Sequence, residues 1–301
     1  MSRIFSPGKL MLTSEYFAVD GALVLAVPTK PGQEFFYEEI QNGKSLIFWQ
    51  AFHQNKLWLS VTIDYSDWRI LETNLPNSAE FILKVLRNIQ QLSTSRFRGN
   101  STYHLRTNLQ FPPDFGLGSS STLMTNLAEW ATIDAFNLND ISLGGSGYDV
   151  AVAKEKSAVL YQNENGKRSV EKVDFSPMFK DELILIHLNQ KQDTREGIHF
   201  YKSKPKSAEL ISEFSELTRK IFESKDLENF SHLMEIHERK VADFLQIKTV
   251  KEKYFEEAPV FVKSMGAWGG DFVLSRQFPG YKAWFSERGF YRIFSWYDLI
   301  N

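Results

Sequence analysis

The chain has 301 residues, a length typical of two domains of roughly 150 residues each. Its composition, 43% hydrophobic and 24% charged, is that of a globular protein and excludes a disordered or collagen-like chain. With 35 basic against 37 acidic residues, the net charge of −2 creates no positive field, so we expect neither nucleic-acid nor membrane binding. The absence of cysteine excludes disulfides, thiolate catalysis and cysteine-built metal sites.

The sequence also bears on the compartment. Its N-terminal segment lacks the apolar stretch of a signal peptide, and the apolar run 22–28 is too short to cross a bilayer. We therefore expect a cytoplasmic protein. We expect it to be a monomer or a homodimer.

The first hundred residues are dominated by predicted strands. Short runs rich in β-branched and aromatic residues predict strands over 22–29, 33–40, 45–52 and 56–63, and Asn42-Gly43 indicates a hairpin between the second and third. Apolar residues at helical spacing then predict a helix over 77–92, with Asn77 or Ser78 as its N-cap. Alternation predicts a further strand over 101–109.

The remaining two thirds mix helices and strands. A Gly/Ser loop enters a helix within 114–136, and a second glycine cluster at 144–147 precedes strands at 157–162 and 168–173. A buried strand is predicted over 182–188, and 193–246 is helical in pattern, with breaks near Lys204-Pro205 and Ser224-Lys225. The predicted elements at the end are strands at 259–264 and 271–276, a helix at 281–287 and a strand at 290–296. This order predicts an α+β fold, with a domain boundary near 175–181.

The strongest local signal of a ligand site is the loop 116–122, at the start of a predicted helix. Its glycines let the backbone approach a ligand closely, and the free amides at a helix N-terminus attract an anion. Hydroxyl groups in the loop can bind phosphate oxygens or Mg²⁺. The loop lacks the lysine of the common P-loop, and a capped helix after a flexible turn explains the same residues when the loop is judged alone.

Other candidate residues are also open to two interpretations when taken alone. Asp149 follows a flexible glycine segment, where its carboxylate could accept a proton from a substrate hydroxyl or simply cap the next helix. Lys9 and Glu15 could form an ordinary surface ion pair. The glycine cluster 266–270 also fits a tight turn between two strands.

Taken together, these segments resemble the GHMP kinases, the family of galactokinase, homoserine kinase, mevalonate kinase and phosphomevalonate kinase. The first family motif is matched from Ser6 to Gly21 and on to Ala26, the second from Pro113 to Ser121, and the third, in part, from Gly266 to Asp271. The segment 145–151 is similar to the G-S-G-F-D-V-A of phosphomevalonate kinases. It also resembles the Gly-Tyr-Asp-Ile-Ala motif of a Bacteroidetes subfamily, with Val150 in place of Ile.

The resemblance implies a two-domain α+β fold, with a ribosomal-S5-like domain over 1–177 and a ferredoxin-like domain over 178–301. It implies a kinase that uses ATP and Mg²⁺, in which Asp149 is the catalytic base, Lys9 its neighbour and the Ser120 hydroxyl a contact of the metal. The ATP phosphates would lie on the loop formed by Gly116, Leu117, Gly118, Ser119, Ser120 and Ser121. The substrate would be contacted by Glu15, Ser146, Gly147, Gly266 and Ala267.

Within the family, the 145–151 segment favours mevalonate or phosphomevalonate, in the pathway to isoprenoid precursors, as the acceptor. A mevalonate diphosphate decarboxylase, a sugar or homoserine kinase, and a non-catalytic nucleotide sensor are the alternatives. Two features depart from the family pattern: the acidic Mg²⁺ ligand has no clear counterpart, Asp140 being the nearest acid, and Trp268 and Asp271 replace glycines. A further polar segment could meet an anionic substrate or form a solvated loop; it contains Lys191, Gln192, Thr194 and Arg195.

Overall fold

The computed structural model describes residues 1–189, 199–266 and 271–301. These residues form two compact units, and the chain passes between the units five times. Unit 1 comprises 1–8, 31–113 and 118–156, and unit 2 comprises 9–30, 114–117 and 157–301. The single boundary predicted at 177/178 is therefore a coarser division, since residues 157–177 lie in unit 2.

Unit 1 is built on one mixed sheet. Its strand order is β5 (Arg69–Thr73), β4 (Lys56–Asp64), β3 (Leu46–His53), β6 (Ser101–Leu109) and the second part of β2 (Val24–Gln41). β3 and β6 run parallel, whereas the other neighbours are antiparallel. β1 (Ser2–Met11) pairs with β2.

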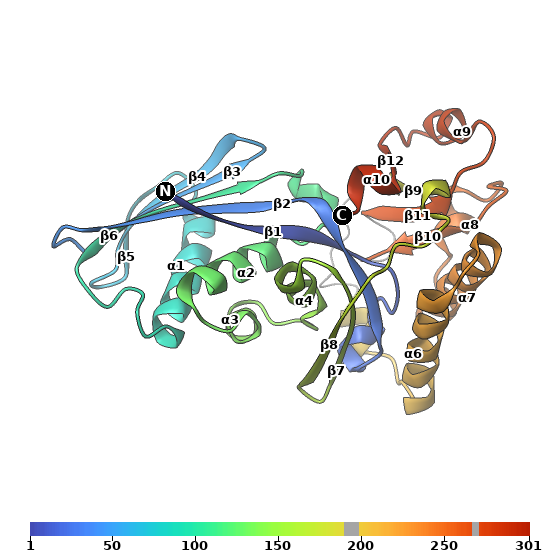
Figure 1. Cartoon of the computed structure of the whole chain (residues 1–301), viewed down its shortest axis with the longest axis horizontal. Coiled ribbons are helices and arrows are strands. Elements are labelled where there is room, and N and C mark those ends of the chain that lie inside the picture. The colour runs from blue at the N-terminus through green and yellow to red at the C-terminus, as the bar shows by residue number, and fades with distance from the viewer. Residues whose placement is uncertain (190–198, 267–270) are drawn as a thin grey trace. The chain divides into compact units, whose positions relative to one another are not determined.

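Helices bury one face of this sheet. α1 (Pro76–Leu92) packs against β4 and β5 (Figure 1), and α2 (Ser119–Ala131) contacts α1, α3 (Ala135–Ser142) and α4 (Tyr148–Glu155). Trp130 of α2 makes edge-on contacts with the rings of Phe35, Phe97 and Tyr103. These rings are buried and form part of the core of unit 1.

Unit 2 contains a βαββαβ arrangement. Its four-stranded antiparallel sheet has the order β10 (Val262–Met265), β11 (Phe272–Arg276), β9 (Leu183–His187) and β12 (Ile293–Ser295). In chain order this is 2-3-1-4, the strand order of a ferredoxin-like sheet. The predicted ferredoxin-like part of the chain is thus present in the second unit.

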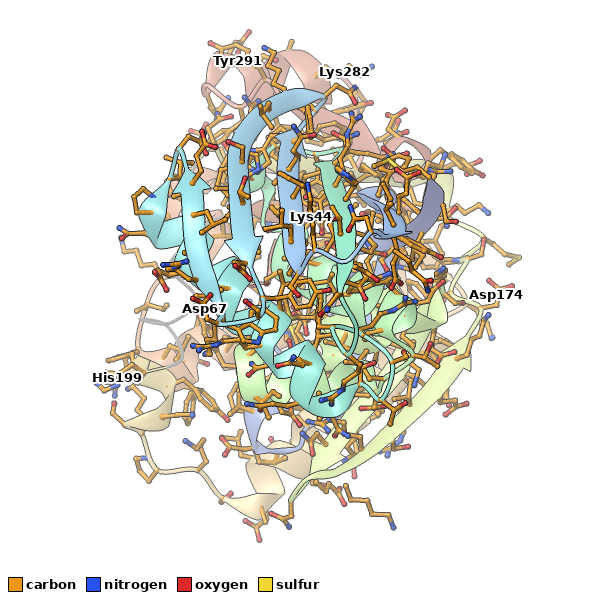
Figure 2. All side chains as sticks on the ribbon, turned by 90° about the vertical axis from the view of Figure 1, so that its left-hand side faces the viewer. Lys44, Asp67, Asp174, His199, Lys282 and Tyr291 are labelled. Carbon is orange, nitrogen blue, oxygen red and sulfur yellow. The ribbon has the colours of Figure 1, made fainter. Side chains whose placement is uncertain are left out.

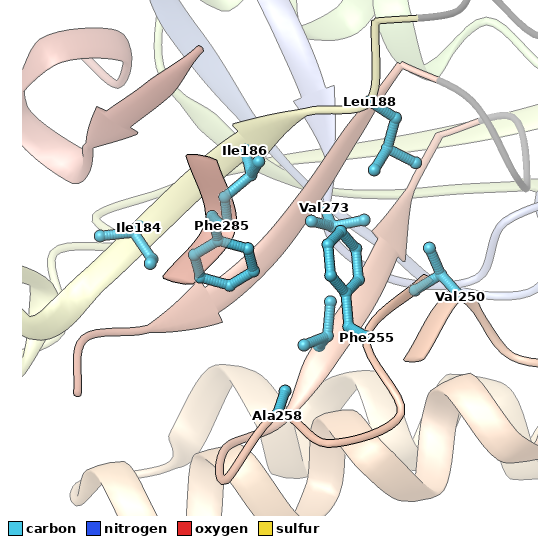
Figure 3. Packing of buried hydrophobic residues seen from close by; sticks show 9 residues of the cluster. Ile184, Ile186, Leu188, Val250, Phe255, Ala258, Val273 and Phe285 are labelled. Atoms are coloured by element: carbon cyan, nitrogen blue, oxygen red, sulfur yellow. The ribbon is translucent and has the colours of Figure 1, made fainter. Parts of the chain in front are cut away.

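Helices complete unit 2. The long pair α6 (Ala208–Glu223) and α7 (Leu227–Leu245) pack on each other (Figure 1), and α8 (Val250–Tyr254) contacts β10. Side chains such as Ile186, Val273 and Phe255, with Phe285 of α9 (Tyr281–Glu287), form a buried apolar cluster (Figure 3). α10 (Trp296–Leu299) directly follows β12.

Unit 2 also holds the first part of β2, which pairs with β7 (Ala158–Glu164), and β7 pairs with β8 (Lys167–Val173). Three 3₁₀ helices lie at Phe17–Asp20, Pro113–Phe115 and Lys180–Glu182.

Several local predictions were wrong. The predicted strands 22–29 and 33–40 are one strand, and Asn42-Gly43 does not form a hairpin, because β6 lies between β2 and β3. α1 begins at Pro76 with Leu75 in the N-cap position, so neither Asn77 nor Ser78 caps it. The helix predicted after the Gly/Ser loop within 114–136 is present as α2 but ends at Ala131, before α3 begins, and the predicted strand 290–296 shortens to β12 before α10.

Among the described helices, none combines the length and apolar character that a membrane span requires.

Candidate active site

The glycine loop leads into a helix whose first amides are not capped. Gly118 is the N-cap residue of α2, its φ of 82° is left-handed, and within the described part of the chain this end of the helix has no side-chain cap. The Ser121 hydroxyl donates to the Gly118 carbonyl at 2.9 Å, while Ser120 is exposed. The N-terminus of this 13-residue helix therefore has the form of an anion site.

The first half of the loop is held by Lys9. The Lys9 backbone amide donates to the Leu117 carbonyl at 3.0 Å, and its ammonium donates to the Gly116 carbonyl at 3.1 Å. Both loop residues and Lys9 belong to unit 2. The first and second motifs are thus joined by two direct hydrogen bonds.

The position of Gly116 is also fixed by Asp271, one of the residues that replace glycines of the family pattern. A Cβ atom at Gly116 would lie 2.1 Å from Oδ2 of Asp271, and the φ of Gly116 is +66°. A Cβ at Gly266 would lie 3.9 Å from the same oxygen. Asp271 therefore packs against the glycine loop, and only glycine fits at position 116.

An aromatic group supports the loop from the side of β9. The Phe115 ring lies against the imidazole of His187, with ring centroids 4.5 Å apart and planes tilted by 31°, and it also contacts Phe272 edge-on. The Arg292 guanidinium lies 5.4 Å from the Phe115 ring. Burial lowers the pKa of His187, so the buried imidazole is neutral at pH 7 and serves as a packing surface.

The predicted base lies at the start of α4, in unit 1. Asp149 is in the first turn of this helix, after Gly147, whose φ is 91°. Its Oδ1 accepts from the Val150 amide at 3.0 Å, and the side chain is half-buried. A helix N-terminus favours a negative charge at this position. Because Asp149 and Lys9 belong to different units, their predicted pairing stays a prediction.

Glu15 has a different environment from the one predicted. Its side chain is fully buried and forms an ion pair with the equally buried Lys263 of β10, rather than with Lys9. The Lys263 ammonium also donates to the Ser264 carbonyl at 2.7 Å. This burial favours a structural role for Glu15 over the substrate contact that the sequence predicts.

Two consecutive residues of α7 complete this buried cluster. The Ser14 amide donates to Nε2 of His237 at 2.7 Å, and the carboxylate of Glu238 accepts from the amides of Val250 and Ser264 at 3.0 and 3.1 Å. Oε2 of Glu15 lies 3.6 Å from Nε2 of His237. The first motif and the strand before the third motif are therefore both anchored on α7.

Burial dominates the electrostatics of the cluster. It raises the pKa of Glu15 against the nearby Lys263 charge, and it raises the pKa of Glu238 to about 7. Burial and the Lys263 charge hold the pKa of His237 well below 6.5. His237 is therefore neutral, which agrees with its Nε2 accepting a hydrogen bond from Ser14.

The sequence analysis missed Lys263, His237 and Glu238. A lysine inside the apolar run PVFVKS was a usable signal, because an unpaired lysine is rarely buried in a strand. Ser146 and Gly147 precede α4 in unit 1, as predicted. Ala267 and Trp268, and the polar segment with Lys191, Gln192, Thr194 and Arg195, lie outside the described residues.

The residues present fit the phosphates of ATP. The uncapped α2 amides and the exposed Ser120 hydroxyl are groups that bind phosphate and Mg²⁺. Within the described ranges, no three His, Asp or Glu side chains gather as a metal site. Mg²⁺ bound with a nucleotide needs only one or two protein ligands, so Ser120 fits and the acidic ligand is not assigned.

Comparison with solved structures shows which proteins share this fold. No family model and no curated protein matches the sequence. Among solved structures, the Methanococcus jannaschii mevalonate kinase matches with a TM-score of 0.70 and 18% identity, over 97% of this chain and 96% of that one. The Streptococcus pneumoniae phosphomevalonate kinase in complex with phosphomevalonate and AMPPNP matches with a TM-score of 0.69 and 16% identity, over 96% of each chain. A D-glycero-D-manno-heptose 1-phosphate kinase from Bacteroides thetaiotaomicron matches with a TM-score of 0.67 and 16% identity, over 99% of this chain and 95% of that one. The chain therefore has the GHMP-kinase fold along almost its whole length.

Proposed function

We propose that the protein is an ATP-dependent kinase of the GHMP type, acting on mevalonate or phosphomevalonate. The observation that carries the proposal is the uncapped N-terminus of α2 behind a glycine loop that Lys9 holds by two hydrogen bonds. The fold, shared along almost the whole chain with small-molecule kinases, supports it.

In this proposal the backbone supplies the phosphate site. The first amides of α2 bind the phosphate oxygens of the nucleotide, and the left-handed Gly118 allows the chain to turn into the helix beside them. Bound ATP with Mg²⁺ supplies the phosphoryl group and neutralises part of its charge. The Ser120 hydroxyl contacts the metal.

The side chains supply positioning and proton transfer. Lys9 fixes the Gly116 carbonyl, and Asp271 packs on Gly116 from the third motif, so the loop cannot shift freely. When the acceptor is mevalonate, Asp149 accepts the proton that its hydroxyl loses as the oxygen attacks the γ-phosphorus and ADP leaves; when it is phosphomevalonate, the attacking oxygen is that of its phosphate group. General-base help of this kind contributes about 10²–10⁴ in rate. Ser146, Gly147 and Gly266 contact the acceptor.

The experiment that tests the function is a parallel assay of acceptors. The purified chain is incubated with ATP and Mg²⁺ and with mevalonate, phosphomevalonate, diphosphomevalonate, galactose or homoserine, and the phosphorylated product is detected directly. We expect turnover with mevalonate or phosphomevalonate above the ATP hydrolysis seen without an acceptor. ATP binding without transfer to any of the five would favour the nucleotide sensor and contradict the proposal.

A further inference from the structure

The sheet of unit 1 has a second face, outside the core, that carries an unusual set of side chains. Along β3, β4 and β6, successive side chains alternate between the buried face and this second face. The second face carries Phe48, Gln50, Thr62, His104 and Arg106. β3 and β4, which form part of this face, lie in the sequence between Lys44 and Asp67, both labelled in Figure 2. Polar residues usually cover such a solvent face, whereas here Phe48 is 37% exposed.

A cavity of about 320 Å³ lies on this face. Its lining comes from four strands of the sheet and from Met1, so it lies wholly within unit 1. The volume is at the lower end of the range typical of small-ligand pockets, roughly 300–1,000 Å³. It has room for a single ring with one substituent group and is too small to be the footprint of a macromolecule.

Arg106 is the cation of the cavity, and it is held in place without an acid. Its guanidinium lies over the ring of Phe52 at 4.1 Å and over Phe36 at 5.7 Å. Its Nε is buried with no hydrogen-bond partner, and within the described part of the chain its side chain makes no ion pair. A guanidinium held rigidly on aromatic rings presents a planar fork that matches a carboxylate or phosphate.

The strand register places a ring platform beside this cation. Phe48 pairs with His104, two residues before Arg106 on β6, and the two rings stack with centroids 5.1 Å apart and planes 12° from parallel. Gln50 pairs with Arg106 in the next row and adds an amide. A flat apolar group over Phe48 would therefore lie one row, a step of roughly 7 Å, from the backbone of Arg106.

The far end of the cavity has the opposite charge. Glu72 lies on β5, which is separated from β6 by β4 and β3 in the sheet. Glu72 pairs with Thr62, which pairs with Phe48, so it lies in the same row as His104, three strand spacings or about 14 Å from it. A second anionic group at that end would be repelled, so the cavity favours a molecule with a single anionic group.

We propose that this cavity is a binding site for a small molecule that carries one flat ring and one carboxylate or phosphate. The ring of the ligand stacks on Phe48, and its anionic group binds the guanidinium of Arg106. The site is separate from the glycine loop and does not depend on the kinase function.

The test uses three ligands that differ only in what the proposal requires. Phenylacetate offers a ring and a carboxylate, phenyl phosphate the same ring and a phosphate, and phenylacetamide the same ring with no charge. Binding to the full chain, without ATP, is measured by ligand-observed NMR titration. We expect saturable binding of at least one anion, and binding of the uncharged amide at least about tenfold weaker than that of its acid. The tighter of the two anions identifies the natural group as a carboxylate or a phosphate.

Two arginine variants separate the site from general charge effects. Arg106→Gln should weaken binding of the anion at least about tenfold, and leave the amide unchanged. Arg3→Gln is the matched control, because Arg3 also lies over a phenylalanine ring, at 5.9 Å from Phe5, but pairs with Glu34 outside the cavity. It should bind the anion as the wild type does.

The outcomes against the proposal are equally defined. Equal binding of phenylacetate and phenylacetamide, or no saturable binding of either anion, overturns it on the wild-type chain alone. Unchanged anion binding in Arg106→Gln, with the fold verified by thermal unfolding, also overturns it.

Discussion

Lys263 shows what single residues reveal and hide in this sequence. It lies in β10 among buried residues, and its positive charge is balanced by Glu15 at a distance of 248 residues along the chain. The sequence pattern predicted the strand, and an unpaired charge within it is an anomaly that could be seen. Its partner could not be predicted, because nothing local connects the first motif to the last.

Lys263→Met tests how much the buried cluster of Lys263, Glu15, His237 and Glu238 stabilises the fold. The change leaves Glu15 and Glu238 buried without their cation, so we expect the free energy of unfolding to fall by about 3–5 kcal/mol. Lys240→Met is the matched control: Lys240 pairs with Glu213 at the surface, and its loss should cost less than about 1 kcal/mol. Urea denaturation of the three proteins measures both values. Equal stability of the two variants would show that the buried pair is not an important contact.

Glu238 predicts a dependence of stability on pH. Burial raises the pKa of its carboxyl to about 7 in the folded state, above its ordinary value of 4.5, so the folded chain holds this proton more tightly than the unfolded chain. The stability that this group contributes is present below pH 4.5 and is lost as the pH rises through about 7. The wild type should therefore lose roughly 3 kcal/mol relative to Glu238→Gln between pH 4.5 and 8.

The comparison of the two proteins isolates Glu238 from its neighbours. Glu15, whose pKa burial also raises, acts in the same direction, and neutral His237 acts in the opposite direction below pH 6.5. Both are present in wild type and variant, as is Lys263. Urea denaturation at a series of pH values gives the difference, and a difference that does not change with pH would show that the pKa of Glu238 is the same in the folded and the unfolded chain.

At the scale of elements, prediction succeeded where the signal was local. The helix 281–287 and the strand 101–109 have the predicted bounds, since each depends on the periodicity of its own residues. The hairpin at Asn42-Gly43 failed because strand pairing is decided by the whole sheet: β6, sixty residues later in the chain, pairs with both β2 and β3. The glycine loop before α2 was predicted correctly, because a positive φ and a helix N-terminus are local properties.

Gly118→Val tests the N-terminus of α2 as the phosphate site. A branched side chain at a left-handed N-cap position should obstruct the phosphates and lower ATP affinity at least about tenfold. Gly280→Val is the matched control, because Gly280 is the left-handed N-cap of α9 with a φ of 77°. It carries the same backbone strain and should leave ATP affinity unchanged. Calorimetric titration with ATP measures both, and equal losses in the two variants would place the nucleotide elsewhere.

At the scale of the whole molecule, the fold followed from the order of motifs more than from any element. Three glycine-containing segments in the order of a known family predicted the GHMP-kinase fold, which the structure comparisons confirm. The division of the chain could not be predicted in the same way. Residues 9–30 and 114–117 belong to unit 2 although their neighbours in sequence belong to unit 1, and only tertiary contacts determine this.

The central claim is that this fold transfers phosphate with Asp149 as the base, and one measurement tests it most directly. Transfer of the labelled γ-phosphate of ATP to the accepted substrate is compared between wild type and Asp149→Asn, with ATP affinity measured on the same samples. The carboxylate acts on the acceptor proton and not on the nucleotide, so turnover should fall by at least about 10² while ATP affinity stays within about twofold. Turnover of the variant within about threefold of the wild type, at a saturating concentration of acceptor, would contradict the account.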